Sequence, residues 1–199
     1  MPLVRRQFPD LPQDHLVFVD DVMAGGNVNG HRICLLRDFS SLPADRRRIV
    51  VAVANSRVRS EIAARCADAG LEFFEVRASN VVQMDAVQIG EGAILSPFVT
   101  LTSNIVIGRH FHANLYSYVE HDCRIGDFVT FGPGVHCNGN VHIEDRAYIG
   151  AGALIRQGTP QRPLVIGADA IVGMGAVVTK DVAPGTTVIG NPARPITKH

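Results

Sequence analysis

A repeat of six residues constrains this chain more than any other feature of its sequence. Steps of six from residue 89 meet an apolar residue at all twelve positions: Ile89, Leu95, Leu101, Ile107, Ala113, Val119, Ile125, Phe131, Cys137, Ile143, Ile149 and Ile155. The residue after each of them is usually small or polar. This period fits neither an α-helix nor an alternating strand, and a fixed period is the signature of repeat architectures.

Each unit of the repeat provides one short strand and one turn, so three successive units close a triangular coil. In such a parallel β-helix the periodic apolar residues point to the axis and stack from coil to coil. The phase breaks at 157–165 and resumes at Ile166 and Val172; it breaks again at 184–188 and resumes at Ile189. We interpret both breaks as loops that protrude from an unbroken solenoid. A Gly-rich β-sandwich with chance spacing is the alternative, and twelve successive matches argue against it.

The first third of the chain follows a different pattern. Nearly continuous apolar runs indicate buried parallel strands, and a helix with Gly70 as its C-terminal cap fits the spacing of Val58, Ile62 and Cys66. Strands are expected at 15–20, 32–36, 48–54 and 71–76, and the helix at 56–69. The order strand–helix–strand predicts a small α/β domain. We therefore expect an α/β domain at 1–78, resembling a truncated Rossmann fold, and a β-helix domain at 79–199.

Composition excludes several classes of protein. The 19 basic residues balance 19 acidic ones, which argues against a nucleic-acid partner. No apolar run approaches the roughly 20 residues of a membrane span, and no signal peptide follows Arg5 and Arg6. Four scattered cysteines without CxxC spacing indicate reduced thiols. We expect a cytoplasmic protein.

One histidine lies where acyl-transfer chemistry is possible. His121 stands two positions after the inward Val119, at an outward corner of the coil, and the period places Gly139 one full coil above it. The glycine leaves room for a ligand and a backbone N–H beside the imidazole. A neutral histidine can take a proton from an attacking nucleophile while an N–H stabilises the oxyanion, and Asp122 or Glu120 could orient the ring. The competing interpretation is an ordinary exposed corner residue.

Three segments resemble a known family: 119–133 (VEHDCRIGDFVTFGP), 148–153 (YIGAGA) and 177–192 (VVTKDVAPGTTVIGNP). They are similar to the left-handed β-helix acyltransferases, and within these to the sugar acetyltransferases related to sialic acid O-acetyltransferase and the UDP-4-amino-sugar N-acetyltransferase. The resemblance implies a left-handed coil and a homotrimer that binds acetyl-CoA between neighbouring β-helices. It also implies a general base at His121, oriented by Asp122.

Binding residues follow less directly. For acetyl-CoA the candidates are Gly139, Gly150, Gly173 and Gly175 as backbone contacts and Lys180 near the phosphates, although tight turns need glycines in any case. For the acceptor the candidates are Asp20, Asp21, Asn55 and Arg57, at carboxyl ends of expected parallel strands, and Thr130. Relatives often carry at the Thr130 position a histidine that touches the acetyl carbonyl. The glycine-rich turn that opens the family's N-terminal domain is missing, since 1–14 contains no glycine, which leaves nucleotide recognition open.

The sequence therefore predicts an acetyltransferase that moves an acetyl group from acetyl-CoA to the amine of a nucleotide-linked amino sugar, by direct attack, in surface-glycan biosynthesis. Two alternatives stay open: a sugar O-acetyltransferase, and a non-catalytic solenoid for CoA binding or trimerisation. The γ-class carbonic anhydrases share this solenoid and bind zinc with three histidines. His110, His112, His136 and His142 do not reproduce the spacing expected for that site, so no metal is expected.

Overall fold

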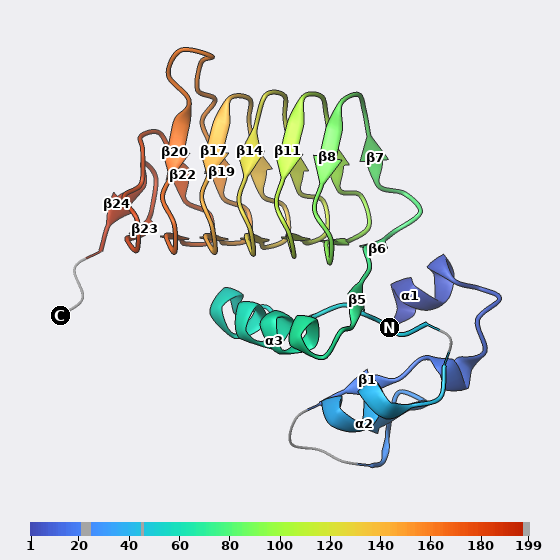
Figure 1. The fold of residues 1–199 in the computed structure, drawn as a ribbon. Coiled ribbons are helices and arrows are strands. Elements are labelled where there is room, and N and C mark those ends of the chain that lie inside the picture. The colour runs from blue at the N-terminus through green and yellow to red at the C-terminus, as the bar shows by residue number, and fades with distance from the viewer. Residues whose placement is uncertain (21–24, 45, 197–199) are drawn as a thin grey trace.

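The computed structural model describes residues 1–20, 25–44 and 46–196. Figure 1 shows a three-sided coil of stacked strands, with a smaller unit of helices and short strands lying along one of its sides. The coil begins at β6 (Val76–Arg77), so the expected boundary at 78 falls within its first turn. No helix in the described part of the chain combines the length and apolar character needed to cross a membrane.

Three sheets form the sides of the coil, and we name them by their number of strands. The eight-stranded sheet contains β6, β9 (Ile94–Leu95), β12 (His112–Ala113), β15 (Thr130–Phe131), β18 (Tyr148–Ile149), β21 (Ile171–Val172), β23 (Thr187–Ile189) and β24 (Arg194–Pro195). The six-stranded sheet contains β7 (Val82–Gln83), β10 (Thr100–Leu101), β13 (Tyr118–Val119), β16 (His136–Cys137), β19 (Leu154–Ile155) and β22 (Val177–Val178). The five-stranded sheet contains β8 (Val87–Ile89), β11 (Ile105–Ile107), β14 (Arg124–Ile125), β17 (Val141–Ile143) and β20 (Leu164–Ile166).

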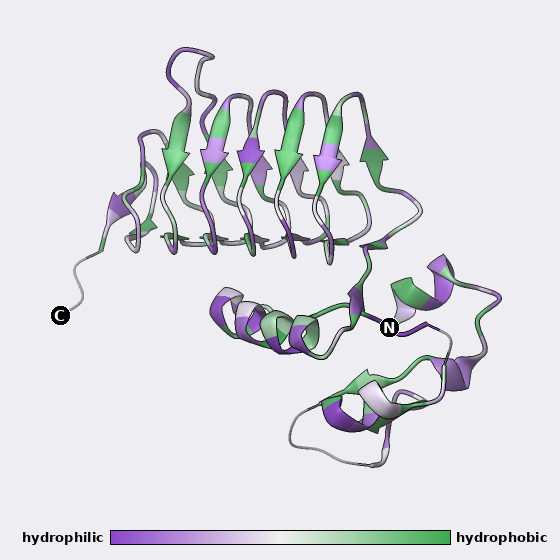
Figure 2. Cartoon of the chain, viewed as in Figure 1, coloured by the Kyte–Doolittle hydropathy of each residue, from purple (hydrophilic) through white to green (hydrophobic). Residues whose placement is uncertain are grey.

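The pairing register confirms the period read from the sequence. Strands pair in parallel with partners that lie three units of the repeat further along, for example Ile107 with Ile125 and Phe131 with Ile149. Apart from the half-buried Ile89, the twelve periodic residues are at most 3% exposed. Cys123 and Cys137 are buried in the same core, and Figure 2 shows apolar residues on most of the strands and polar ones in the turns between them.

One inward position was predicted wrongly. Ile189 is 48% exposed, whereas Val188 is 4% exposed and pairs with Val172. The last coil is shorter than the others, since Val188 follows its partner two positions sooner than the period requires. A fixed step of six therefore overshoots Val188 by two residues at this end of the solenoid, and the expected restart at Ile189 overshoots it by one.

The N-terminal unit differs from the single parallel sheet that was expected. Its elements are α1 (Pro2–Gln7), η1 (Gln13–His15), β1 (Phe18–Val19), β2 (Asn27–Val28), β3 (His31–Cys34), α2 (Leu36–Ser41), β4 (Arg48–Ile49), α3 (Ser56–Asp68) and β5 (Glu72–Phe73). The pairs β1–β3 and β4–β5 are parallel as predicted, but they belong to separate sheets. β2 forms an antiparallel hairpin with β3 through Asn29 and Gly30, both at positive φ.

Helix α3 begins at Ser56 as predicted and ends at Asp68, one residue before the predicted end. The Asn55 side chain accepts hydrogen bonds from the backbone N–H groups of Arg57 and Val58, at 3.1 Å each, which is the usual way to cap a helix N-terminus. Gly70 follows the helix at a φ of 70°, a conformation that glycine adopts without steric cost.

Arg59 fastens α3 to the eight-stranded sheet. Its side chain is fully buried, and its guanidinium donates hydrogen bonds to the carbonyl oxygens of Val53 (2.8 Å) and Phe128 (2.6 Å) and to the Thr130 hydroxyl (2.9 Å). Burial lowers the pKa of Arg59 to about 10. The Ala54 carbonyl also accepts a hydrogen bond from Arg59. The strand expected over 48–54 is only two residues long, and the carbonyls of Val53 and Ala54 bind Arg59.

Loss of a core ring should destabilise the solenoid strongly. Phe131→Ala removes a fully buried side chain that packs edge-to-face on Phe111, with ring centroids 5.2 Å apart. We expect the free energy of unfolding to fall by about 3–5 kcal/mol, the usual cost of such a cavity, measured by denaturant titration. Tyr116→Ala is the control: Tyr116 is 62% exposed, and a loss below about 1 kcal/mol is expected. Equal losses in both variants would contradict the core assignment.

Two buried histidines should make the fold sensitive to acid. Burial, and then the charge of Arg59, lower the pKa of His110 to about 4 and of His112 to about 3. Below about pH 6.5 the unfolded chain therefore binds protons that the folded chain does not, so the free energy of unfolding should fall as the pH drops toward 4.

Urea midpoints at pH 7.5 and pH 5 measure this effect, with His110→Phe as the matched variant. The His110 ring lies between Phe73 and Phe128, at centroid distances of 4.6 and 4.9 Å, so a phenyl ring fits the same stack. This variant should keep its stability at pH 7.5 and lose less of it at pH 5. A pH dependence as steep as that of the wild type would exclude His110 as a cause.

Candidate active site

The site is built at the corner between the six-stranded and five-stranded sheets. The residues that turn this corner in successive coils include Asn104, Asp122 and Asn140, at φ values of 59°, 59° and 56°. Asn and Asp adopt this left-handed conformation more readily than other residues with side chains. The turn therefore selects Asp122 for its backbone, and so places a carboxylate directly after His121.

His121 and Asp122 form a hydrogen-bonded pair. His121 Nδ1 lies 2.8 Å from Asp122 Oδ2, and Asn104 Nδ2 donates to the other carboxylate oxygen at 3.2 Å. The hydrogen bond from His121, together with the one from Asn104, lowers the pKa of Asp122, so the carboxylate is ionised at neutral pH. A proton on Nδ1 satisfies this contact and leaves the lone pair on Nε2 for chemistry. The pair is about half exposed.

Gly139 lies against the imidazole, as the period of the repeat predicted. A Cβ at Gly139 would stand 2.6 Å from His121 Cε1 and 2.7 Å from Nε2. The backbone N–H of Gly139, expected to face a ligand, instead donates to Glu120 Oε2 at 3.2 Å. Sequence reasoning considered Glu120 only as a partner for the ring. The period places Asn138, not Gly139, one coil above Glu120, so counting gave no signal for this contact. The Gly139 carbonyl oxygen accepts a hydrogen bond from the Gly158 N–H at 2.9 Å. The extra loop at 157–165, which interrupts the repeat, therefore begins next to Gly139.

The other glycines proposed for acetyl-CoA lie elsewhere on the coil. Gly150 and Gly173 follow β18 and β21, so they sit at the opposite edge of the six-stranded sheet from His121. A Cβ on Gly150 would come within 2.6 Å of the Met174 nitrogen, so close stacking of coils explains that glycine. Gly175 has a φ of 65° and open space around it. Lys180 is exposed just after β22, on the His121 side of that sheet.

Of the proposed acceptor residues, three lie in the N-terminal unit and Thr130 lies on the face of the coil that packs against α3. Asp20 is exposed after β1, and Asp21 lies outside the described residues. Asn55 caps α3, and Arg57 forms an ion pair with Asp169, Nε to Oδ1 at 3.3 Å. Thr130 is 2% exposed, and its hydroxyl accepts the hydrogen bond from Arg59.

These two sets of residues lie on opposite sides of one chain. Thr130 and α3 belong to the eight-stranded side of the coil, whereas His121 lies at the corner formed by the other two sheets. In Figure 1 the helix is below the coil, and the extra loop that follows β19 rises from the top, at the His121 corner. A single chain therefore does not bring the expected acceptor residues to the expected base. Within the described residues, no group of three or more His, Cys, Asp or Glu side chains could hold a metal ion.

Comparisons with known proteins agree on one family. Residues 122–157 match the family model described as bacterial transferase hexapeptide (six repeats). The GDP-perosamine N-acetyltransferase of Escherichia coli O157:H7 is 54% identical over 90% of this chain and 81% of its own length.

Solved structures extend the similarity to the whole fold. WeeI from Acinetobacter baumannii AYE superposes with a TM-score of 0.96 and 56% identity, covering 98% of this chain and 92% of that one. PerB from Caulobacter crescentus, solved with CoA and GDP-perosamine, has a TM-score of 0.77 and 29% identity over 85% of this chain and 81% of that one.

Substitution of Gly139 tests the contact that positions the imidazole. In Gly139→Ala the new methyl group would overlap the His121 ring, so the ring must move and acetyl transfer measured as thiol release should fall by about tenfold or more. The control is Gly134→Asn at another corner, where φ is 63° and a Cβ meets no atom within 4 Å. Asparagine accepts this conformation, so its rate should match that of the wild type. Full activity in Gly139→Ala would show that the ring has no fixed position.

Proposed function

This chain belongs to the bacterial hexapeptide-repeat acyltransferases, whose fold is the left-handed parallel β-helix, and we propose that it acetylates the amino group of GDP-perosamine or a similar GDP-linked amino sugar. It is an acetyl-CoA-dependent acyltransferase that acts on an amino sugar. We infer the perosamine acceptor from two relatives, the GDP-perosamine N-acetyltransferase of Escherichia coli O157:H7 and PerB, which was solved with GDP-perosamine. The His121–Asp122 pair beside Gly139 is the observation in this chain that supports the chemistry.

The proposed reaction is a direct transfer. His121 Nε2 takes a proton from the sugar amine as the amine nitrogen attacks the thioester carbon. The tetrahedral intermediate collapses, the carbon–sulfur bond breaks, and the CoA sulfur leaves as a thiol with the proton that His121 returns. Asp122 holds Nδ1–H throughout (2.8 Å) and stabilises the imidazolium that forms, because its charge lies next to the ring. No acyl-enzyme is needed, since the donor is already a thioester.

We also propose that the active enzyme is a homotrimer with its sites between subunits. Acceptor candidates Asp20, Asn55 and Arg57 lie on the side of the chain away from His121, so a neighbouring copy must supply them. Gly173 and Gly175 sit at the edge of the six-stranded sheet opposite Gly139, which gives the two walls of an acetyl-CoA groove if adjacent copies meet along these edges.

The cellular setting follows from the chemistry. Cys34, Cys66, Cys123 and Cys137 form no disulfide in the structure, which fits a reducing compartment. We therefore place the reaction in the cytoplasm, as a step that modifies an amino sugar for a surface glycan.

Thiol release from acetyl-CoA, with GDP-perosamine as acceptor, tests the proposal. His121→Ala should lose about 10²–10⁴-fold in kcat, the usual contribution of a general base, and Asp122→Asn should lose less because it removes only the orienting charge. His15→Ala, a histidine exposed on η1, should match the wild type. Undiminished transfer by His121→Ala would exclude it as the base.

The same assay separates the alternatives. A GDP-linked sugar that offers only hydroxyl groups should not be acetylated, and turnover on it with silence on the amino sugar would identify an O-acetyltransferase. Binding of CoA without turnover on either acceptor would identify a non-catalytic solenoid.

A further inference from the structure

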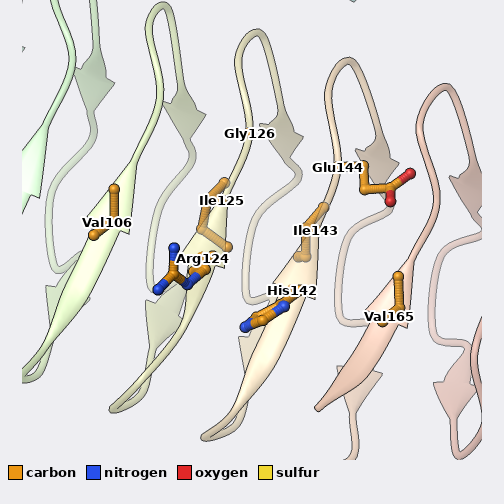
Figure 3. Close-up of a pocket in the computed structure, with 8 residues that line it drawn as sticks. All are labelled: Val106, Arg124, Ile125, Gly126, His142, Ile143, Glu144 and Val165. Carbon is orange, nitrogen blue, oxygen red and sulfur yellow. The ribbon is translucent and has the colours of Figure 1, made fainter. Parts of the chain in front are cut away.

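A shallow hollow lies on the five-stranded sheet, beside the corner that carries His121. Its volume is about 290 Å³, and Figure 3 shows the residues around it. The lining residues come from β11, β14, β17 and β20 and the turns after them: Val106, Arg124, Ile125, Gly126, His142, Ile143, Glu144 and Val165. Arg124 is three residues after His121, so at most about 11 Å separates their Cα atoms.

Two nitrogen-bearing side chains stand side by side at the centre of this hollow. Arg124 and His142 are Cα partners on β14 and β17, and both point outward because Ile125 and Ile143 occupy the inward positions. The outward positions on the neighbouring strands are Val106 and Val165. Figure 2 shows the same contrast, with polar colour on β14 and β17 between the apolar strands β11 and β20.

The positive charge of Arg124 has no partner of opposite charge in the part of the chain that the structure describes. Among the described residues Arg124 has neither an ion pair nor a side-chain hydrogen bond, and His142 likewise makes no side-chain hydrogen bond. The neighbouring corner differs, since Arg109 pairs with Asp127 at 2.6 Å and Arg146 with Asp169 at 2.8 Å. The one carboxylate of the hollow, Glu144, accepts a hydrogen bond from the Ala168 N–H at 2.8 Å.

This arrangement suits a phosphate group. A guanidinium offers planar paired N–H donors that match two phosphate oxygens. Burial, and then the charge of Arg124, lower the pKa of His142, so at neutral pH the imidazole is uncharged and contributes an N–H donor. The flanking valines place apolar side chains on both sides of the pair and offer no polar group that competes for these donors.

We propose that Arg124 and His142 form a phosphate-binding subsite of the active site, which holds a phosphate group of one of the two substrates. The proposal rests on the function proposed above, because both acetyl-CoA and a GDP-linked sugar carry a diphosphate. A phosphate held here places one substrate against the corner where His121 stands, so the subsite contributes to substrate binding and leaves the proton transfer to His121.

Calorimetric binding of CoA and of GDP to the full chain tests this subsite directly. In Arg124→Gln the dissociation constant of one of the two ligands should rise by about tenfold or more, as expected for loss of a charged hydrogen-bonded contact, and in His142→Gln by less. Arg124→Lys should fall between Arg124→Gln and the wild type, because it keeps the charge without the paired donors. Arg6→Gln, which removes an exposed charge on α1, should change neither constant.

The ligand that is affected identifies the phosphate. Weaker CoA binding with unchanged GDP binding assigns the subsite to the acyl donor; the reverse assigns it to the acceptor. In steady-state kinetics the KM of the same substrate should rise while kcat stays within about twofold, unlike the kcat loss expected for His121→Ala.

Two results would overturn the proposal. Constants for both ligands within twofold of the wild type in Arg124→Gln would show that no phosphate binds here. A smaller oligomeric mass of Arg124→Gln in light scattering would show that Arg124 serves a contact between subunits instead. A failure of the proposed function would be detected by the thiol-release assay. The calorimetric experiment does not depend on it, because binding of CoA and GDP is measured without any acetyl transfer.

Discussion

The stacking of inward apolar residues from one coil to the next is the constraint on which the rest of the structure depends. Each coil buries three such residues against the coils on either side, as in the column Ala113, Phe131 and Ile149, so the backbone of every coil must superpose on the next. Variation is then possible only on outward positions and at corners, and an insertion must leave the stack as a loop. The chemistry of the molecule is found at those places.

The corners show how a backbone requirement becomes a functional arrangement. Each one turns through a residue in the left-handed conformation, and different corners meet this need with different residues: Asn104, Asp122 and Asn140 at the His121 corner, but Phe98 and Tyr116 at the apolar corner beside Gly134. At the first corner the Asp122 side chain hydrogen-bonds the His121 imidazole, and the Asn104 side chain hydrogen-bonds Asp122. Asp122 satisfies the turn and holds His121 with the same residue. Gly139, one coil above, has no side chain and so leaves room for the ring against its backbone.

The parts predicted from sequence are those that the repeat determines. The core residues, the stacking of His121 under Gly139 and the loop at 157–165 follow from counting, and counting failed at Ile189 because the last coil is shorter. The docking of the N-terminal unit could not be found this way. Arg59 looks like an exposed helix residue in the sequence, yet its charge is buried and satisfied by carbonyl groups that the coil supplies through Phe128. Glu120 is a similar case, since its contact with Gly139 depends on side-chain geometry.

Separation of the two halves of the proposed site has a consequence for assembly. The N-terminal unit covers the eight-stranded sheet, and His121 stands at the corner farthest from it, so the coil itself keeps them apart in one chain. A contact that joins them must pair unlike surfaces of two copies, and such heterologous contacts either close into a ring or continue as a filament. A coil with a triangular cross-section favours closure about an axis parallel to its own, since identical coils then stay in step along their length. The proposed ring therefore follows from where the fold places the His121 corner.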